Sequence, residues 1–237
     1  MTLLKPEDAA ALIAQTRSEK AVLIGGQAVA FWAEYYGIRS NLPVLTGDID
    51  YLATISEAKR ISARLRIPHT LKVASLDDHT PNSAVILVEM EGYPEPVLID
   101  YLASIVGLKS EDIDRSAVVV QFEGEPLRVL HPLHLLQAKV WNLYHLQEKR
   151  NPEGIEQARL ATEIAAAFIE RAHMSQRELL NAIETIGRFA ATAPARFVSE
   201  RFGLKCLQAI PKSVFKEGVL PGEFHNKRWP QILAAAK

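Results

Sequence analysis

The sequence predicts an α+β protein with a small mixed β-sheet core and a C-terminal helical domain. Up to about residue 130, short apolar runs alternate with turns and amphipathic stretches, in an order that mixes hairpins with helical connections. Beyond that point no strand is evident, and apolar residues recur at helical spacing. We therefore expect two domains, an α/β core over residues 1–130 and a helical domain over residues 131–237.

The expected strands of the core are short apolar runs bounded by turn residues. They cover residues 21–24, a run that carries Asp48 and Asp50, and then 71–74, 83–90, 96–101, 118–122 and 127–130. The turn at 91–96 predicts that the strands on either side of it are antiparallel neighbours. Helices are expected over 5–15, after Gly25-Gly26, over 56–65 with Ser56 as N-cap, and over 108–113, with a loop at 77–82.

The second half is expected to be helical throughout. The predicted helices are 131–147, 155–172, 175–190 and 195–207, followed by an irregular tail with a final turn at 231–236. Ser175 followed by Glu178 fits a capping box at the start of the third of these helices.

Composition excludes several classes of protein. The net charge is −1, so no global basic field indicates nucleic-acid binding, and the single Cys206 allows no internal disulfide. The N-terminus lacks the pattern of a signal peptide, and no apolar run has the length of a membrane span. We expect a soluble cytoplasmic protein without a membrane partner.

The chain is organised around residues 21–53, which read as strand, tight turn, helix, loop and strand. Gly25 and Gly26 allow a sharp turn and a close approach of the backbone to a ligand. The helix that follows presents unpaired N–H groups toward this turn, an arrangement that suits a phosphate. Asp48 and Asp50 are two residues apart, so on a strand they share one face, while Ile49 faces the core.

Two carboxylates side by side repel each other unless a cation lies between them. Oxygen ligands of this kind suit Mg²⁺, which proteins often hold with one or two carboxylates and substrate phosphates. A D-x-D or a glycine pair alone is more often a solvated turn, so the prediction depends on their order along the chain.

This order resembles the nucleotidyltransferase superfamily with the polymerase-beta-like fold. The resemblance is carried by residues 23–26 (LIGG) and 48–51 (DIDY). More narrowly the chain is similar to AbiE-type abortive-infection toxins and related bacterial nucleotidyltransferase-like proteins, in which GG-x-A-h and a later R-x-S/T-x-D-h-D are usual. It departs from that group by a longer gap before Asp48, with residues 41–47 as the insertion.

The resemblance implies site residues beyond the acidic pair. A third carboxylate would come from a later strand, for which Asp100 is the first candidate and Glu89 the alternate. Gly25, Gly26 and Gln27 would cradle the β- and γ-phosphates of a nucleoside triphosphate. Lys139, on the first helix of the second half, would neutralise phosphate charge. The acidic D-x-x-D stretch of the toxin group is missing; its nearest substitutes are Glu153 and Glu156.

The resulting hypothesis is a nucleotidyltransferase that uses Mg²⁺ (or Mn²⁺) to move a nucleotide from an NTP to an unknown acceptor. RNA, a protein hydroxyl or a small molecule would serve as acceptor, and the toxin likeness implies an antitoxin partner. One alternative is a catalytically inactive protein of the same fold that acts by binding; another is a metal-dependent nuclease with the same carboxylates.

The segment around residues 56–66 is basic, with Lys59, Arg60, Arg64 and Arg66. The simplest interpretation is a solvated helix face. The alternative is a surface near an anionic substrate.

Overall fold

A computed structural model describes residues 3–40, 46–75 and 82–236, which form two compact units. We call residues 1–31 and 43–131 the sheet unit, and residues 32–42 and 132–237 the helical unit. Residues 41–45 of the expected insertion and residues 77–81 of the expected loop lie outside the described part of the chain.

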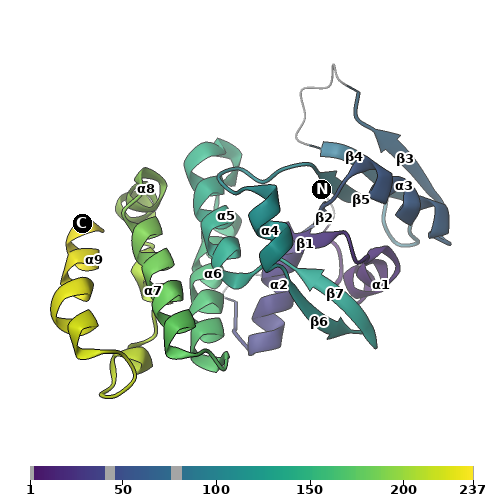
Figure 1. The fold of residues 1–237 in the computed structure, drawn as a ribbon. Coiled ribbons are helices and arrows are strands. Elements are labelled where there is room, and N and C mark those ends of the chain that lie inside the picture. The colour runs from purple at the N-terminus through teal and green to yellow at the C-terminus, as the bar shows by residue number, and fades with distance from the viewer. Residues whose placement is uncertain (1–2, 41–45, 76–81, 237) are drawn as a thin grey trace. The chain divides into compact units, whose positions relative to one another are not determined.

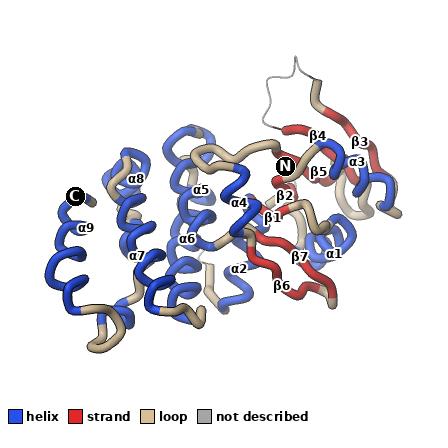
Figure 2. The backbone as a smooth tube through the Cα atoms, viewed as in Figure 1, coloured by secondary structure: helices blue, strands red, loops and turns tan. Residues whose placement is uncertain are grey.

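The sheet unit contains one seven-stranded mixed sheet in the order β3-β4-β5-β2-β1-β7-β6 (Figures 1 and 2). Its strands are β1 (Val22–Ile24), β2 (Asp48–Leu52), β3 (His69–Val73), β4 (Asn82–Val88), β5 (Val97–Leu102), β6 (Val118–Phe122) and β7 (Glu125–Val129). β2 runs parallel to β5, and β1 runs parallel to β7, while the other neighbours are antiparallel. The predicted fold class is confirmed.

The sheet unit also contains helices α1 (Pro6–Thr16), α3 (Ile55–Arg64) and α4 (Ser110–Ser116). Of helix α2 (Gly25–Tyr36), residues 25–31 belong to this unit. Ile49 and Tyr51, which alternate with the acids along β2, point away from them and are fully buried, as the alternation predicts. The Tyr51 hydroxyl lies 3.0 Å from Thr16 Oγ1 at the end of α1, so α1 covers this face of the sheet.

Local details of the sheet unit depart from the expectations by a few residues. β4 and β5 are antiparallel neighbours, as the turn between them predicts. The N-cap of α3 is Thr54 instead of the expected Ser56, because the Thr54 hydroxyl accepts the N–H of Glu57. Helix α3 therefore begins at Ile55, one residue before the expected start at 56. The Ser56 hydroxyl lies 2.8 Å from the Thr54 hydroxyl.

The helical unit has its own core. Its α-helices are α5 (Pro132–His145), α6 (Pro152–Arg171), α7 (Gln176–Ala190), α8 (Ala193–Phe202) and α9 (Trp229–Ala235). Short 3₁₀-helices are η1 (Gln147–Lys149), η2 (Cys206–Ala209) and η3 (Lys212–Phe215), and η4 (Phe224–Arg228) is a π-helical turn. Leu143, Ile183 and Val198 are fully buried in one cluster that these helices share. The predicted capping box of Ser175 and Glu178 is present at the start of α7.

Two expectations for this unit were wrong at helix ends. The expected helix over 195–207 ends at Phe202, because Gly203 adopts a left-handed conformation with φ of 71°. Residues after it form the η2 turn instead. The tail contains η3 and η4 where an irregular segment was expected, while α9 lies where the final turn at 231–236 was expected. Among the described residues, none of the helices combines the length and apolarity that crossing a membrane requires.

Candidate metal centre

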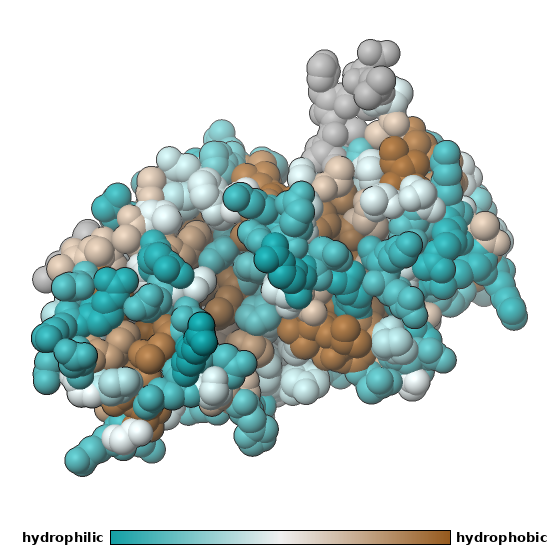
Figure 3. Space-filling view, in the orientation of Figure 1, coloured by the Kyte–Doolittle hydropathy of each residue, from teal (hydrophilic) through white to brown (hydrophobic). Residues whose placement is uncertain are grey.

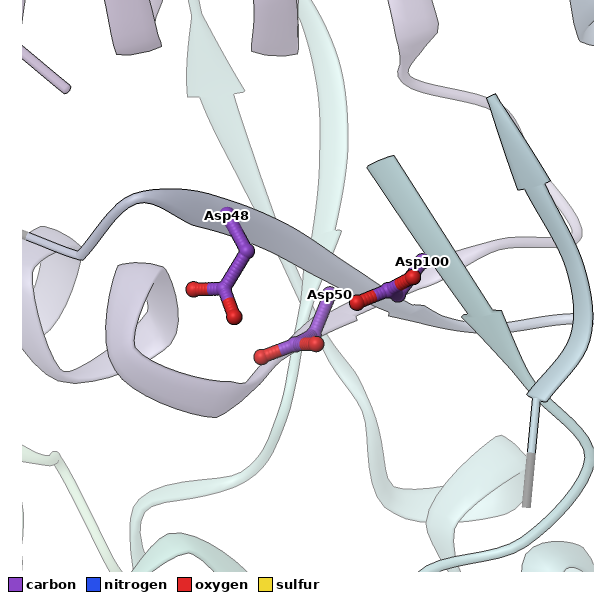
Figure 4. Close-up of side chains that lie close together, drawn as sticks. All are labelled: Asp48, Asp50 and Asp100. Carbon is purple, nitrogen blue, oxygen red and sulfur yellow. The ribbon is translucent and has the colours of Figure 1, made fainter. Parts of the chain in front are cut away.

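Three aspartates from two neighbouring strands meet on one face of the sheet. Asp48 and Asp50 lie on β2, and Asp100 on β5 stands directly opposite Asp50 in the parallel register. One carboxylate oxygen from each of the three lies within 4.8 Å of the others, and all three side chains are half-buried. Figure 4 shows the three carboxylates gathered on the same side of their strands. The sheet thus brings together the acids that the sequence nominated.

Asp100 is the acid whose protonation the fold changes most clearly. Burial and, secondly, the negative charge of Asp48 raise the pKa of Asp100 from its ordinary 3.8 to about 6. Asn82 Nδ2 donates a 3.0 Å hydrogen bond to Asp100 Oδ1 from the start of β4. Asp100 therefore holds its proton to a higher pH than an ordinary aspartate does.

The tight turn at Gly25 is shaped around Asp50. Gly25 has φ of +69°, and a Cβ built on it would lie 1.9 Å from Asp50 Oδ2. No side chain other than hydrogen fits between this turn and the carboxylate. The Asp50 carboxylate consequently lies at the N-terminus of α2, where the positive end of the helix dipole favours a negative charge.

Gln27 stabilises the backbone next to the carboxylates through Thr46. Its side chain is buried, and its Nε2 donates to Thr46 Oγ1 at 2.8 Å. Thr46 Oγ1 in turn donates to the main-chain carbonyl of Asp48 at 2.9 Å. The pair fixes the backbone at the start of β2. A phosphate-binding role for Gln27, as the resemblance implied, would have to come from its main-chain N–H.

The donor set fits a hard divalent cation. All three side chains offer oxygen only, and their nearest oxygens are close enough to share one ion. Without a cation, three carboxylates at this separation would repel one another. The pKa of Asp100 is raised mainly by burial, and the charge of Asp48 adds to this effect. The arrangement fits Mg²⁺ or Mn²⁺ better than zinc, because the cluster includes no histidine or cysteine.

The other nominated residues lie outside the cluster. Glu89, the alternate third acid, follows the end of β4 and is exposed. Gly26 is buried in the first turn of α2. Lys139 belongs to the helical unit, where its buried Nζ donates to Gln157 Oε1 at 2.7 Å. Its contact with a phosphate stays a prediction.

Two supporting residues were missed from the sequence. Thr46 fell within the expected insertion, and Asn82 within the expected loop. For Asn82 a signal was present: counting the antiparallel pairs back from the turn at 91–96 places the start of β4 beside the strand of Asp100. Thr46 had no comparable signal, because its role depends on contacts with Gln27, which is far away in sequence.

Comparison with known proteins gives only weak similarity. No protein-family model matches the chain, and no curated protein matches it. An antigenic nucleotidyltransferase-like protein from Paracoccidioides brasiliensis is 14% identical, with a TM-score of 0.46 over 90% of this chain and 99% of that one. JHP933 from Helicobacter pylori is 14% identical, with a TM-score of 0.43 over 98% of this chain and 97% of that one. We infer function from the carboxylates themselves.

Proposed function

We propose that the protein is a metal-dependent nucleotidyltransferase that moves a nucleotide from an NTP to an acceptor hydroxyl. The observation that supports this most directly is the convergence of Asp48, Asp50 and Asp100 beside the N-terminus of α2. Carboxylates for a cation and a helix N-terminus for a phosphate are the two groups that an NTP needs.

Each residue has a distinct part in the proposed reaction. Asp48 and Asp50 would hold Mg²⁺, with Asp100 completing the set; a bound Mg²⁺ neutralises phosphate oxygens and the charge that develops on them. The main-chain N–H groups of Gly26 and Gln27 would face the β- and γ-phosphates. Lys139 would neutralise phosphate charge, as the resemblance implies.

Asp100 would also accept the proton of the acceptor hydroxyl, since its pKa of about 6 lies close to neutral pH. The acceptor oxygen then forms a bond to the α-phosphorus, and the bond from that phosphorus to the bridging oxygen of the β-phosphate breaks. Pyrophosphate leaves with the electron pair, and the carboxyl of Asp100 later loses its proton to water. Positioning and charge stabilisation supply most of the acceleration in such a transfer.

The likeness to AbiE-type toxins extends this proposal to the cell. The acceptor would be an RNA end, a protein hydroxyl or a small molecule, and an antitoxin would hold the transfer in check in the cytoplasm. Growth arrest on expression, relieved by the Asp50→Asn substitution and by the product of a neighbouring gene, is the expected cellular result.

A labelling assay tests the proposal. The full-length protein is incubated with Mg²⁺ and each α-labelled NTP in turn, in the presence of cell RNA, protein or small-molecule extract. The parent protein should transfer label to one acceptor class, and Asp50→Asn should reduce labelling by roughly a hundredfold or more, because a carboxylate ligand is lost. The Asp112→Asn variant, which changes an exposed acid on α4, should label as the parent does.

Two outcomes would contradict the proposal. Equal labelling by Asp50→Asn and the parent would remove the carboxylates from the chemistry. Release of nucleotides from RNA without any added NTP would instead favour a metal-dependent nuclease. Titration calorimetry with Mg²⁺ and each NTP distinguishes the inactive alternative, which predicts no nucleotide binding to the parent protein.

A further inference from the structure

A second charged site lies in the sheet unit, away from the carboxylates. It is a hollow of about 560 Å³ between the end of α1, the outer face of α3 and the start of β7. Four arginines line it: Arg17, Arg60, Arg64 and Arg66. Three of them come from the basic segment around α3, whose role the proposed transfer reaction leaves unexplained. Figure 3 shows hydrophilic surface over the right-hand part of this unit, where Figure 1 places α1 and α3.

The hollow is on the opposite face of the sheet from the metal centre. Tyr51 alternates with Asp50 along β2, so its side chain leaves the sheet on the other face. On that face the Tyr51 hydroxyl meets Thr16, the residue before Arg17. None of the three aspartates lines the hollow. A ligand held here is therefore separated from the carboxylates by the thickness of the sheet.

Of these four arginines, Arg60 alone has a close acidic partner among the described residues. Arg60 forms a 2.6 Å ion pair with Glu57, whose buried carboxylate also accepts a hydrogen bond from Ser18. Burial, the largest single influence, raises the pKa of Glu57, but these contacts together outweigh it, so the pKa is lowered overall. In the described part of the chain, Arg17, Arg64 and Arg66 form no ion pair.

The remaining charge is positive and partly held in place. Glu19 and Glu125 also line the hollow, so with Glu57 the arginines still outnumber the carboxylates. Arg17 Nη1 donates to the Ala14 carbonyl at 2.6 Å, and Arg64 Nη2 donates to the carbonyl of Arg17. Each guanidinium has five N–H donors, so these single contacts leave further donors for a ligand. Fixed guanidinium groups suit phosphate oxygens, which they bind in a bidentate way.

We propose that this arginine pocket binds the phosphate groups of a second ligand, distinct from the NTP of the proposed reaction. Several phosphates in close succession match several guanidiniums around one hollow, whereas a single carboxylate would leave most of them unsatisfied. Such phosphates belong either to a small polyphosphate anion or to a strand of nucleic acid. The site is independent of the proposed transfer reaction, so its existence and that of the transferase activity are separately testable.

The experiment measures binding to the full-length protein in EDTA, so that metal-bridged binding to the aspartates is prevented. Tripolyphosphate is titrated in one arm by calorimetry, and a fluorescent single-stranded oligouridylate in the other by anisotropy. The Arg66→Ala variant removes an exposed arginine of the pocket, and Arg64→Ala removes a second. Arg115→Ala is the matched control, because Arg115 is an exposed arginine of the same unit on α4, with 77% of its side chain exposed.

Binding of either probe to the parent that weakens roughly tenfold or more in each pocket variant, and not in Arg115→Ala, would support the proposal. Glu125→Gln removes a negative charge from the rim and should tighten the same binding roughly threefold. Tripolyphosphate binding identifies a small anion as the ligand, and binding of the oligouridylate alone identifies a strand. The proposal is overturned if neither probe binds in the millimolar range, or if the pocket variants bind as the parent does. Thermal unfolding of each variant shows that it is folded.

Discussion

Gly25 is the residue whose substitution tests the metal centre most directly. In Gly25→Ala, the new Cβ would lie 1.9 Å from Asp50 Oδ2, and φ of +69° would also be strained. The carboxylate must move, so we expect Mg²⁺ binding to be lost and the free energy of unfolding to fall by more than the ~1–2 kcal/mol that a left-handed non-glycine residue costs. Calorimetry with Mg²⁺ and denaturant unfolding measure the two effects.

Gly92→Ala is the matched control for this substitution. Gly92 also has a positive φ, of +85°, but a Cβ there meets nothing within 4 Å. It should cost about 1 kcal/mol through backbone strain alone and leave Mg²⁺ binding unchanged. If Gly25→Ala binds Mg²⁺ as well as Gly92→Ala does, Asp50 is not held by the turn as the structure indicates.

Asp100 gives a pH dependence of stability with a definite sign. Its pKa is about 6 in the folded chain and 3.8 in its ordinary state, so the folded protein binds the proton more tightly. The stability that this proton contributes is complete below about pH 4 and is lost as the pH rises through about 6. In EDTA at pH 8, Asp100→Asn should therefore be more stable than the parent, by an amount on the order of 1 kcal/mol after allowance for partial exposure.

Urea unfolding of both proteins across this pH range measures the effect. The difference between them should shrink toward pH 4, and Mg²⁺ should reverse its sign at pH 8, because only the parent keeps all three carboxylates. A parent protein that gains stability relative to Asp100→Asn as the pH rises in EDTA would show that Asp100 is stabilised as an anion instead.

At the residue scale, the sequence predicted the carboxylates of the candidate metal centre. The alternation in DIDY places Asp48 and Asp50 on one face, and Asp100 follows an apolar run of the same kind. The sequence showed three of the pocket arginines only as a basic helical segment. It did not predict the pocket, because Arg17 comes from a different element and is brought beside them by folding. Thr46 was missed for the same reason, whereas the hairpin register offered a signal for Asn82 that the prediction did not use.

Among the elements, β4 contributes to the site through its first residue. Asn82 donates to Asp100 Oδ1, and such a bond stabilises the charged carboxylate. Asn82→Ala should raise the pKa of Asp100 further and shift the pH midpoint of Mg²⁺ binding upward, with affinity at pH 7 reduced by roughly tenfold. Calorimetry with Mg²⁺ at several pH values measures this shift.

Ser83→Ala is the neighbouring control. The Ser83 hydroxyl donates to the main-chain carbonyl of Tyr101 at 2.8 Å and makes no contact with Asp100 among the described hydrogen bonds. It tests whether any disturbance at the start of β4 affects the acids. Equal shifts in Asn82→Ala and Ser83→Ala would assign the effect to strand pairing and not to the amide.

The presence of helices and strands was predicted better than their ends or their order in the sheet. The β4–β5 hairpin follows from two apolar runs and a turn, all of it local. The end of α8 is also a local feature, since Gly203 is a stop signal that the prediction of a helix to residue 207 did not use. The order of the seven strands, with β1 between β2 and β7, depends on long-range pairing that no local pattern encodes.

At the scale of the whole molecule, the candidate metal centre belongs to one unit only. All three carboxylates, Gly25 and Asn82 lie in the sheet unit, which has its own buried residues, such as Ile99 on β5. The helical unit has a separate cluster that includes Ile183 on α7. The change of periodicity near residue 130 predicted a helical second half, but nothing in the sequence indicated that residues 32–40 belong to the helical unit.

This division predicts different effects from two equally buried isoleucines. Ile183→Ala and Ile99→Ala each remove a fully buried side chain, so each should lower the free energy of unfolding by about 2–5 kcal/mol. At a temperature where both variants are folded, Ile183→Ala should bind Mg²⁺ within about twofold of the parent. Ile99→Ala should bind it roughly tenfold more weakly, because the strand that holds the neighbouring Asp100 loses packing support. Thermal unfolding and Mg²⁺ calorimetry on the same samples separate the effects. A parallel loss of Mg²⁺ affinity in folded Ile183→Ala would mean that the carboxylate cluster depends on the helical unit for its geometry.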